Sequence, residues 1–219
     1  MIVAIDGPAA SGKSTTAKKV AEALGFAYLD TGAMYRAVTL AILKKNIDMN
    51  DPVALKMLLD SMDLNVSTKN GDTVVTLNGI NVSDHIRSVE VTQHVSAVSA
   101  IPVVRESMVK IQRDIGHRSD CVCEGRDIGT VVFSDAEYKF FIIAERETRA
   151  KRRQLDLRNM GEERSVEELV SDLKIRDQKD STRKHSPLTR AADAVEVDTT
   201  HMTLDEQVMY IVSKVKKVK

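Results

Sequence analysis

Near its start the chain reads Gly7-Pro8-Ala9-Ala10-Ser11-Gly12-Lys13-Ser14, which fits the pattern G-x-x-x-x-G-K-S/T at every position. A β-branched apolar run, residues 2–5, leads into this stretch, and a helical pattern over residues 13–24 follows it. Glycine lets the backbone approach phosphate oxygens, so that successive N–H groups and the helix N-terminus can hold an anion. We expect Lys13 to reach the β- and γ-phosphates of a nucleotide and the Ser14 hydroxyl to bind Mg²⁺.

Strand-like and helical segments alternate along most of the chain. We expect five core strands, at residues 2–6, 26–30, 120–124, 139–144 and 194–198. Helical patterns cover residues 13–24, 33–45, 52–60, 88–100, 102–116, 147–159, 166–176 and 204–216. Strands joined by crossover helices are typical of α/β proteins. The sequence therefore predicts a doubly wound five-stranded parallel sheet that carries the phosphate-binding loop.

Residues 46–100 have a different pattern. Three short alternating segments, residues 64–69, 73–77 and 80–83, are separated by Asn70-Gly71 and Asn78-Gly79. Asn-Gly readily adopts positive φ at both turn positions and is the strongest short hairpin signal. We expect a small antiparallel three-stranded β insert within residues 46–100. Residues 1–45 and 101–219 then form the core, which includes a helical lid at about residues 150–165.

Composition limits the class of protein. The chain has 219 residues, with 32 Lys and Arg against 32 Asp and Glu, no Trp and only 4% aromatic residues. Neutral net charge and few aromatic residues argue against a protein that coats nucleic acid. No apolar stretch is long enough to span a membrane, and Met1 leads directly into the first strand without a signal peptide. Cys121 and Cys123 lie on one face of a strand, where buried, reduced thiols are expected. We expect a cytoplasmic protein without nucleic-acid or membrane partners.

Further anion-binding residues follow the predicted strands. Arg36 lies in the segment Asp30-Thr31-Gly32-Ala33-Met34-Tyr35-Arg36 after the second strand, and Arg126 lies in Glu124-Gly125-Arg126-Asp127 after the third. Arg176, Asp180 and Arg183 are spaced to share one face near a helix end. Any one of these arginines, taken alone, is more simply explained as a surface ion pair. In a doubly wound sheet, however, ligands bind outside the carboxyl ends of the strands, so together they predict a second phosphate site beside the loop.

A phosphate-binding loop alone leaves several functions open. A guanine-reading Asn-Lys-x-Asp segment, expected for a GTPase switch, is missing from the sequence. Another small-molecule kinase of this class, for shikimate or another monophosphate, remains an alternative. A regulatory or nucleic-acid-binding protein is a further alternative, supported by the basic stretch 146–158, although that stretch also contains Glu147 and Asp156.

The chain resembles the bacterial-type cytidylate kinases, a family of nucleoside-monophosphate kinases. The resemblance covers essentially the whole chain and is carried by residues 7–15, 30–36, 96–106, 124–133 and 176–188. The block 124–133, Glu-Gly-Arg-Asp-Ile-Gly-Thr-Val-Val-Phe, is its most specific part, and the β-rich insert is also typical of the family. Some relatives carry Ser where Thr31 stands and Gly where Ser14 stands.

The resemblance implies roles for individual residues. The ATP-binding residues are expected to be Gly7, Pro8, Ala9, Ala10, Ser11, Gly12, Lys13, Ser14 and Thr15, with Arg149, Arg152 and Arg158 around the lid. The residues that bind the acceptor nucleotide are expected to be Thr31, Arg36, Ser96, Arg105, Arg126, Asp127, Arg176, Asp180 and Arg183. Among these, Arg36, Arg126 and Arg183 would hold the acceptor phosphate and act with Lys13 in catalysis. Ser96, Arg105 and Asp127 would read the cytosine edge, and Asp180 with Arg176 would bind the sugar hydroxyls.

The implied activity is transfer of the γ-phosphoryl group of MgATP to CMP or dCMP, which gives CDP or dCDP and ADP. Mg²⁺ is the only cofactor implied, with Ser14 as its protein ligand, and the partners implied are the small nucleotides ATP, CMP and dCMP. The sequence shows no obvious apolar stripe that could form a subunit interface, and we expect a monomer.

Overall fold

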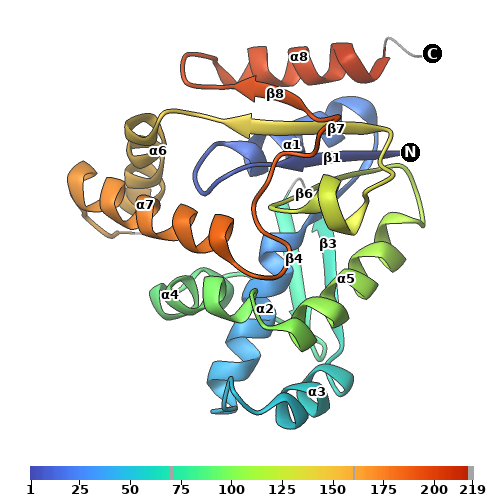
Figure 1. The fold of residues 1–219 in the computed structure, drawn as a ribbon, viewed down its shortest axis with the longest axis vertical. Coiled ribbons are helices and arrows are strands. Elements are labelled where there is room, and N and C mark those ends of the chain that lie inside the picture. Colours follow the sequence, from blue (N-terminus) through green and yellow to red (C-terminus); the bar gives the residue numbers. More distant parts are fainter. Residues whose placement is uncertain (70–71, 160, 217–219) are drawn as a thin grey trace.

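A computed structural model describes residues 1–69, 72–159 and 161–216. Over these residues the main sheet has five strands: β1 (Ile2–Asp6), β2 (Ala27–Asp30), β6 (Cys121–Gly125), β7 (Tyr138–Ile143) and β8 (Val195–Asp198). The strands are all parallel, in the order β2-β6-β1-β7-β8 (Figure 1). This arrangement confirms the predicted α/β fold, and each observed strand lies within one residue of its expected bounds.

Helices cover both faces of the sheet. They are α1 (Lys13–Leu24), α2 (Thr31–Lys44), α3 (Pro52–Asp60), α4 (Val89–Val98), α5 (Pro102–Gly116), α6 (Arg146–Asn159), α7 (Val166–Thr182) and α8 (Leu204–Lys216). A 3₁₀ turn, η1 (His85–Arg87), precedes α4, and a turn of π-helix, η2 (Ile128–Val132), follows β6. The sequence patterns did not predict η2.

The apolar side chains of β1, β2 and β6 divide between two cores. Val3, Val122 and Phe140 pack beneath α1 and α8 in one core. Ala4 and the free, buried Cys121 and Cys123 face the other core, which contains side chains of α2, α3, α4 and α5. β1 and β6 are buried along their whole length, and strands buried on both faces read as continuous apolar runs in the sequence.

Two glycines fix the course of the phosphate-binding loop. A Cβ atom at Gly7 would lie 2.2 Å from the carbonyl oxygen of Ile142, so only glycine lets the loop pass this close to β7. Gly12 has φ 90° and precedes α1 directly. The loop therefore begins at the end of a buried strand and leads into a helix N-terminus, as predicted.

The insert contains the expected small sheet. Within the described residues its three strands are β3 (Leu64–Lys69), β4 (Asp72–Leu77) and β5 (Ile80–Asn81), paired antiparallel in that order. Positive φ at Asn78 and Gly79 gives the predicted tight turn, whereas Asn70-Gly71 lies outside the described residues. β5 ends earlier than the predicted Ser83, because the Asn81 side chain accepts hydrogen bonds from the Ser83 backbone and hydroxyl.

The insert shares apolar cores with the rest of the chain. Val75 and Val82 pack against Ala37 of α2, while Leu55 and Leu58 of α3 belong to the core beneath the main sheet. The division into residues 46–100 and a separate core stays a prediction, but it does not correspond to a division of the packing.

Helix α7 differs most from its predicted bounds. It continues six residues beyond Arg176, through a polar segment that lacks any apolar periodicity, and ends at Thr182. Tertiary contacts stabilise this extension, because Asp180 binds both Ser96 and Arg126. Arg183 already has an extended backbone, so the prediction that it continues one helical face with Arg176 and Asp180 was wrong.

Helices α6 and α7 form a lobe beside the phosphate-binding loop (Figure 1). Leu157, Leu169 and Leu173 pack together with Ala9 of the loop, in a small cluster apart from the two main cores. Ser165 and Glu168 form a capping box that starts α7. The predicted lid, about residues 150–165, covers most of α6 and the connection to α7, in which Met160 lies outside the described residues.

No helix in the described ranges is long and apolar enough to cross a membrane.

The shared core of the insert can be tested by truncating one side chain of α3. Replacing the fully buried Leu55 with Ala should lower the free energy of unfolding by about 2–5 kcal/mol, because it leaves a cavity. The matched control is Met57→Ala on the same helix, where the side chain is 69% exposed and the expected change is within about 0.5 kcal/mol. Urea unfolding followed by circular dichroism would measure both. A separate early transition for the insert in Leu55→Ala would contradict a shared core.

Candidate active site

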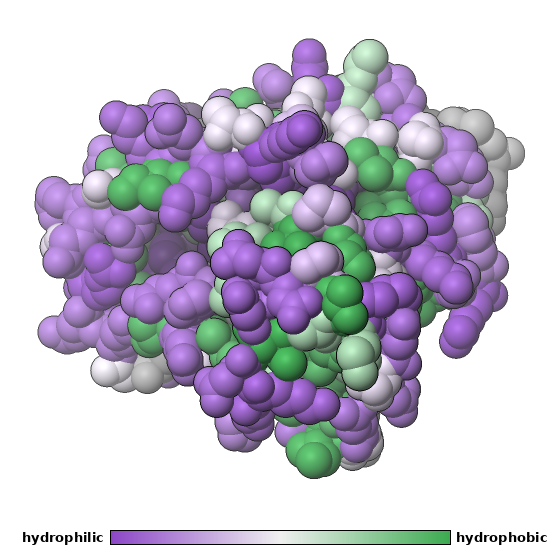
Figure 2. Space-filling model, turned by 60° about the horizontal axis from the view of Figure 1, so that its bottom comes forward, coloured by the Kyte–Doolittle hydropathy of each residue, from purple (hydrophilic) through white to green (hydrophobic). Residues whose placement is uncertain are grey.

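The site lies where three neighbouring strands end. β2, β6 and β1 are adjacent in the sheet and end at Asp30, Gly125 and Asp6. The phosphate-binding loop, the start of α2 and the loop after β6 therefore emerge side by side. Figure 2 shows a hollow bordered mainly by hydrophilic residues, on the side of the molecule where Figure 1 places α6 and α7.

Lys13 and Ser14 share one carboxylate partner. The Ser14 hydroxyl donates to Glu124 Oε1 at 2.7 Å, and Lys13 Nζ lies 3.7 Å from Glu124 Oε2. Burial and the nearby Arg126 lower the pKa of Lys13 to about 8, although Glu124 acts in the opposite direction. Glu124 was not among the predicted site residues. The signal was available, because an acidic residue stands directly before Gly125 and Arg126.

Thr31 and Asp30 join the start of α2 to the same place. The Thr31 hydroxyl donates to the backbone oxygen of Glu124 at 2.7 Å, and the Asp30 side chain caps α2 at Ala33 N. Burial, and then the negative charge of Glu124, raise the pKa of Asp30. The carboxylates of Asp30 and Glu124 thus lie close together beside Lys13. Their combined negative charge favours a cation next to them.

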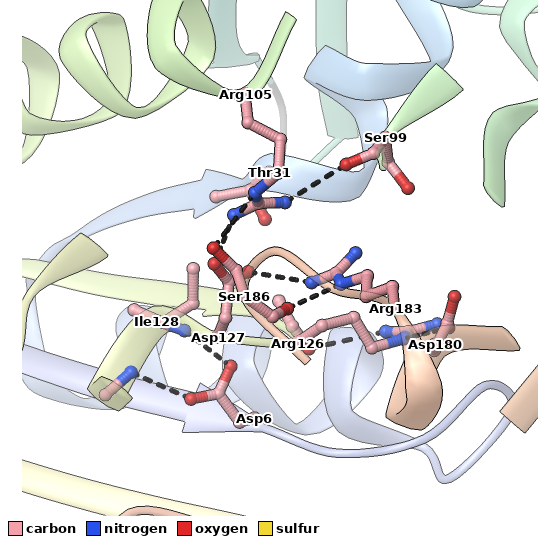
Figure 3. Close-up of polar contacts among 12 residues, drawn as sticks. Asp6, Thr31, Ser99, Arg105, Arg126, Asp127, Ile128, Asp180, Arg183 and Ser186 are labelled. Atoms are coloured by element: carbon pink, nitrogen blue, oxygen red, sulfur yellow. Dashed lines mark hydrogen bonds and ion pairs between the residues drawn. The ribbon is translucent and has the colours of Figure 1, made fainter. Parts of the chain in front are cut away.

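Arg105 and Asp127 form a buried ion pair (Figure 3). Arg105 Nη2 binds Asp127 Oδ2, Arg105 Nη1 donates to the Ser99 backbone oxygen at 3.2 Å, and the guanidinium lies over the Tyr35 ring. Arg183 Nη2 reaches the other oxygen of Asp127 at 3.5 Å. Burial raises the pKa of Asp127, although both arginines act to lower it.

Asp180 joins α7 to the loop after β6 and to α4. It accepts from the Ser96 hydroxyl at 2.9 Å and from Arg126 Nε at 3.0 Å. Burial alone would raise the pKa of Asp180, but Arg126 and Arg176 hold it below its ordinary value. Ser96 and Arg126, which come from distant parts of the chain, therefore both bind the carboxylate of Asp180.

Arg36 and Arg176 are buried, and neither forms an ion pair among the described residues, although Asp30 acts on the pKa of Arg36 and Asp180 and Asp177 act on that of Arg176. Arg36 donates to Thr92 Oγ1 at 2.9 Å and to the Ile86 backbone oxygen at 3.2 Å, both uncharged groups. Arg176 Nε is buried without a hydrogen-bond partner among the described residues. Burial, followed by neighbouring arginines, lowers the pKa of Arg36 to about 9 and that of Arg176 to about 10. The neighbours include Arg153, which the sequence reasoning did not select.

The predicted lid arginines are placed differently from one another. Arg149 donates to the backbone oxygen of Ala9 at 3.1 Å and pairs with Asp177 of α7 at 2.7 Å. Arg152 donates to the backbone oxygen of Ser11 at 2.9 Å and also binds Thr199. Arg158 is exposed, and in the ranges the structure describes no ion pair joins it to the cluster. Two arginines of the basic stretch therefore bind backbone oxygens of the phosphate-binding loop.

Asp6 anchors the loop that carries Arg126 and Asp127. Its two carboxylate oxygens accept from Ile128 N and Gly129 N, each at 2.8 Å (Figure 3). Burial raises the pKa of Asp6 to about 7, against the effect of these two hydrogen bonds. Sequence reasoning treated Asp6 only as the end of a strand, because nothing in the pattern indicated that η2 would return to it.

Together these groups can neutralise two anions. Lys13, Arg126 and Arg176 lie close enough for each arginine charge to lower the pKa of Lys13, and Arg36 interacts similarly with Arg176. Such buried cations favour phosphate groups, which add negative charge beside them. In the described part of the chain, no group of three or more His, Cys, Asp and Glu side chains could hold a metal alone.

Comparisons with known proteins agree with this chemistry. A family model described as cytidylate kinase matches residues 3–217. A cytidylate kinase of Lactobacillus johnsonii is 46% identical over 99% of this chain and 94% of its own length. A cytidylate kinase of Halalkalibacterium halodurans is 45% identical over 99% of this chain and 98% of its own length.

Solved structures show the likeness in fold. A crystal structure of an uncharacterized protein from Eubacterium ventriosum has a TM-score of 0.53 and 15% identity, and covers 99% of this chain and 98% of its own. A protein from Thermus thermophilus has a TM-score of 0.52 and 16% identity, with coverage of 100% and 97%.

The low pKa of Lys13 predicts proton uptake when a nucleoside triphosphate binds. Roughly half of the Lys13 side chains are neutral at pH 8, and a bound polyphosphate should restore their charge. Calorimetry at pH 8 in buffers of different ionisation enthalpy would measure the protons taken up. Lys13→Arg, which stays charged, should take up about half a proton less. Equal uptake by the two proteins would contradict the lowered pKa.

Proposed function

The chain belongs to the cytidylate kinase family, and on this premise we propose that it transfers the γ-phosphoryl group of ATP to CMP or dCMP. The products are CDP or dCDP and ADP. The observation that carries the proposal is the meeting of Lys13 with Arg126 and Arg176, beside the Asp127–Arg105 pair. Phosphate-binding cations and a polar, hydrogen-bonding pair are thus adjacent, as binding of a nucleotide through both its phosphate and its base requires.

ATP binds with its phosphates at the loop formed by residues 7–15. The left-handed backbone at Ala10 and Gly12 supports this assignment, because such turns let successive N–H groups converge on an anion. Lys13 neutralises the β- and γ-phosphates, while Arg149 and Arg152 hold the loop from α6. Arg158, exposed at the end of α6, would reach the nucleotide only if the lid moves.

The acceptor phosphate binds among Arg36, Arg126 and Arg183, with Arg176 beside them. The support is electrostatic: burial and mutual repulsion leave Arg36 and Arg176 with lowered pKa values that a phosphate dianion would raise again. Arg126 is linked through Asp180 to Ser96, so the phosphate side and the sugar side of the acceptor share one network.

Cytosine is read by Arg105 and Asp127. A carboxylate accepts from the exocyclic amino group, and a guanidinium donates to the ring nitrogen and carbonyl oxygen. Uracil presents an oxygen where cytosine has its amino group, which would leave buried Asp127 opposite another acceptor. Ser96 lies near this edge through its bond to Asp180, which with Arg176 binds the sugar hydroxyls.

Magnesium fits the oxygen donors beside the loop. The Ser14 hydroxyl and Glu124 Oε1 lie 2.7 Å apart next to Lys13, and Mg²⁺ prefers a few oxygen ligands completed by phosphate oxygens and water. We assign Ser14 as a direct ligand and Glu124 as the carboxylate that orients it or a bound water. When bound, the ion neutralises charge on the β- and γ-phosphates.

The chemical step is an in-line displacement. An oxygen of the acceptor phosphate attacks the γ-phosphorus, a new P–O bond forms, and the bond from that phosphorus to the bridging β–γ oxygen breaks. The attacking oxygen is already ionised at neutral pH, so no strong general base is needed. Catalysis therefore consists of positioning and of stabilising charge by Lys13 and the arginines.

We further propose a cytoplasmic monomer whose partners are these small nucleotides, without nucleic acid or membrane. The free, buried Cys121 and Cys123 suit a reducing compartment. The inward placement of Arg149 and Arg152 also reduces the positive charge that the stretch 146–158 could offer to a nucleic acid.

Removing a phosphate-holding arginine tests the proposal. Arg126→Ala or Arg183→Ala should lower kcat for CMP phosphorylation by about 100-fold or more, because charge in the transition state loses its partner. The matched control is Arg190→Ala, whose half-exposed side chain pairs with the exposed Glu196; its kcat should stay within about twofold. A coupled assay for ADP would measure all three, and near-normal turnover in both site variants would refute the assignment.

Substrate choice is a separate expectation. With CMP, dCMP, UMP, AMP and GMP compared side by side, kcat/KM should be highest for CMP and dCMP, lower for UMP, and negligible for the purine nucleotides. Preference for a purine monophosphate would instead favour the alternative of another small-molecule kinase.

The magnesium assignment predicts a specific pair of variants. Ser14→Ala should raise the Mg²⁺ concentration needed for half-maximal activity by about tenfold, whereas Ser14→Thr, which keeps a hydroxyl, should stay near the wild type. Titrating Mg²⁺ at fixed ATP and CMP would measure the shift. An unchanged requirement in Ser14→Ala would show that the hydroxyl is not a ligand.

A further inference from the structure

We infer that Ser186 is a positioning residue that fixes the base-reading Arg105 and the phosphate-holding Arg183 relative to one another. The inference rests on the proposed function and adds to it a residue that determines selectivity for cytosine. Ser186 lies after α7 and was not among the predicted site residues, and its hydroxyl contacts Arg105, 81 residues away in the sequence.

The backbone at Ser186 has an uncommon conformation. Its φ is 50°, a value that residues other than glycine rarely adopt, and Pro187 follows it directly. A proline further restricts the residue before it towards extended conformations. Surrounding contacts must therefore hold this turn, and such outliers concentrate where a site requires a particular direction of the chain.

In this conformation the hydroxyl and the backbone oxygen of Ser186 face Arg105 and Arg183. Its backbone oxygen accepts from Arg183 Nε, and its hydroxyl accepts from Arg105 Nε at 3.0 Å (Figure 3). The Ser186 side chain also acts to lower the pKa of Asp127, against the larger effect of burial, which raises it. The hydroxyl can do both because it has one proton to donate and lone pairs to accept with. Ser186 thus closes a ring with Arg105, Asp127 and Arg183.

The ring matters because it fixes the plane of the Arg105 guanidinium. Its three nitrogens each have a separate partner: Ser186 for Nε, the Ser99 backbone oxygen for Nη1 and Asp127 for Nη2. The remaining N–H groups then point in defined directions, which a planar base edge needs. Without the hydroxyl, Nε of an arginine that is only 5% exposed would lose its partner, and the pair with Asp127 could rotate.

Two substitutions separate the hydroxyl from the turn. Ser186→Ala removes the hydroxyl but keeps a Cβ at positive φ, whereas Ser186→Gly removes it and suits this backbone. The matched control is Ser181→Ala on α7, whose hydroxyl donates to the Gln178 backbone oxygen of its own helix. Thermal unfolding of each variant would show that it is folded, and KM and kcat would be measured for CMP, UMP and ATP.

Both Ser186 variants should raise KM for CMP by about tenfold, with KM for ATP unchanged within twofold. They should also lower the ratio of kcat/KM for CMP to that for UMP by about tenfold. The control should match the wild type in all of these quantities. A loss confined to Ser186→Ala would overturn the inference, because the turn and not the hydroxyl would then matter, and so would unchanged CMP selectivity in both. If the wild-type protein itself did not prefer CMP, the proposed function would fail instead.

Discussion

Mutual repulsion among buried cations is the constraint on which this site depends. Lys13, Arg36 and Arg176 all have lowered pKa values, because each is removed from water and faces other positive groups. The folded chain keeps them together with Glu124 and Asp180, which hold Lys13 and Arg126 in place. Phosphate groups would relieve the remaining repulsion, so nucleotide binding and the stability of this region are thermodynamically linked.

Carboxylates give the site its geometry as well as its balance of charge. Asp180 ties α7 to α4 and to the loop after β6, and Asp127 ties Arg105 to Arg183. Asp6 fixes the start of η2 through two backbone N–H groups, and so sets the direction of the residues before it. Each of these carboxylates binds at least one group more than fifty residues away, which makes the site a product of the whole fold.

A structural feature could be predicted from the sequence where its signal lies in neighbouring residues. Continuous apolar runs and the glycine motif revealed the sheet and the phosphate-binding loop, and Asn78-Gly79 revealed a hairpin. The family resemblance supplied most of the clustered arginines. Local patterns failed where distant contacts decide the structure. Helix α7 extends because Asp180 has partners on other elements. The turn η2 forms where the Asp6 carboxylate accepts a hydrogen bond from Ile128 N. Glu124 and Ser186 were missed because their roles exist only once the chain has folded around them.

The packing of the insert has a consequence for motion. Leu55, Leu58, Val95 and Val98 share one core with the main sheet, so the base-reading side and the catalytic loop would move as one rigid body. Helices α6 and α7 meet the rest of the chain through a smaller apolar cluster, through the Arg149 and Arg152 contacts, and through the bonds of Asp180 to Ser96 and Arg126. Rotation of this lobe about its two ends, near Glu145 and Arg183, would therefore have to break the Asp180 bonds, and such a movement would shield the proposed reaction from water.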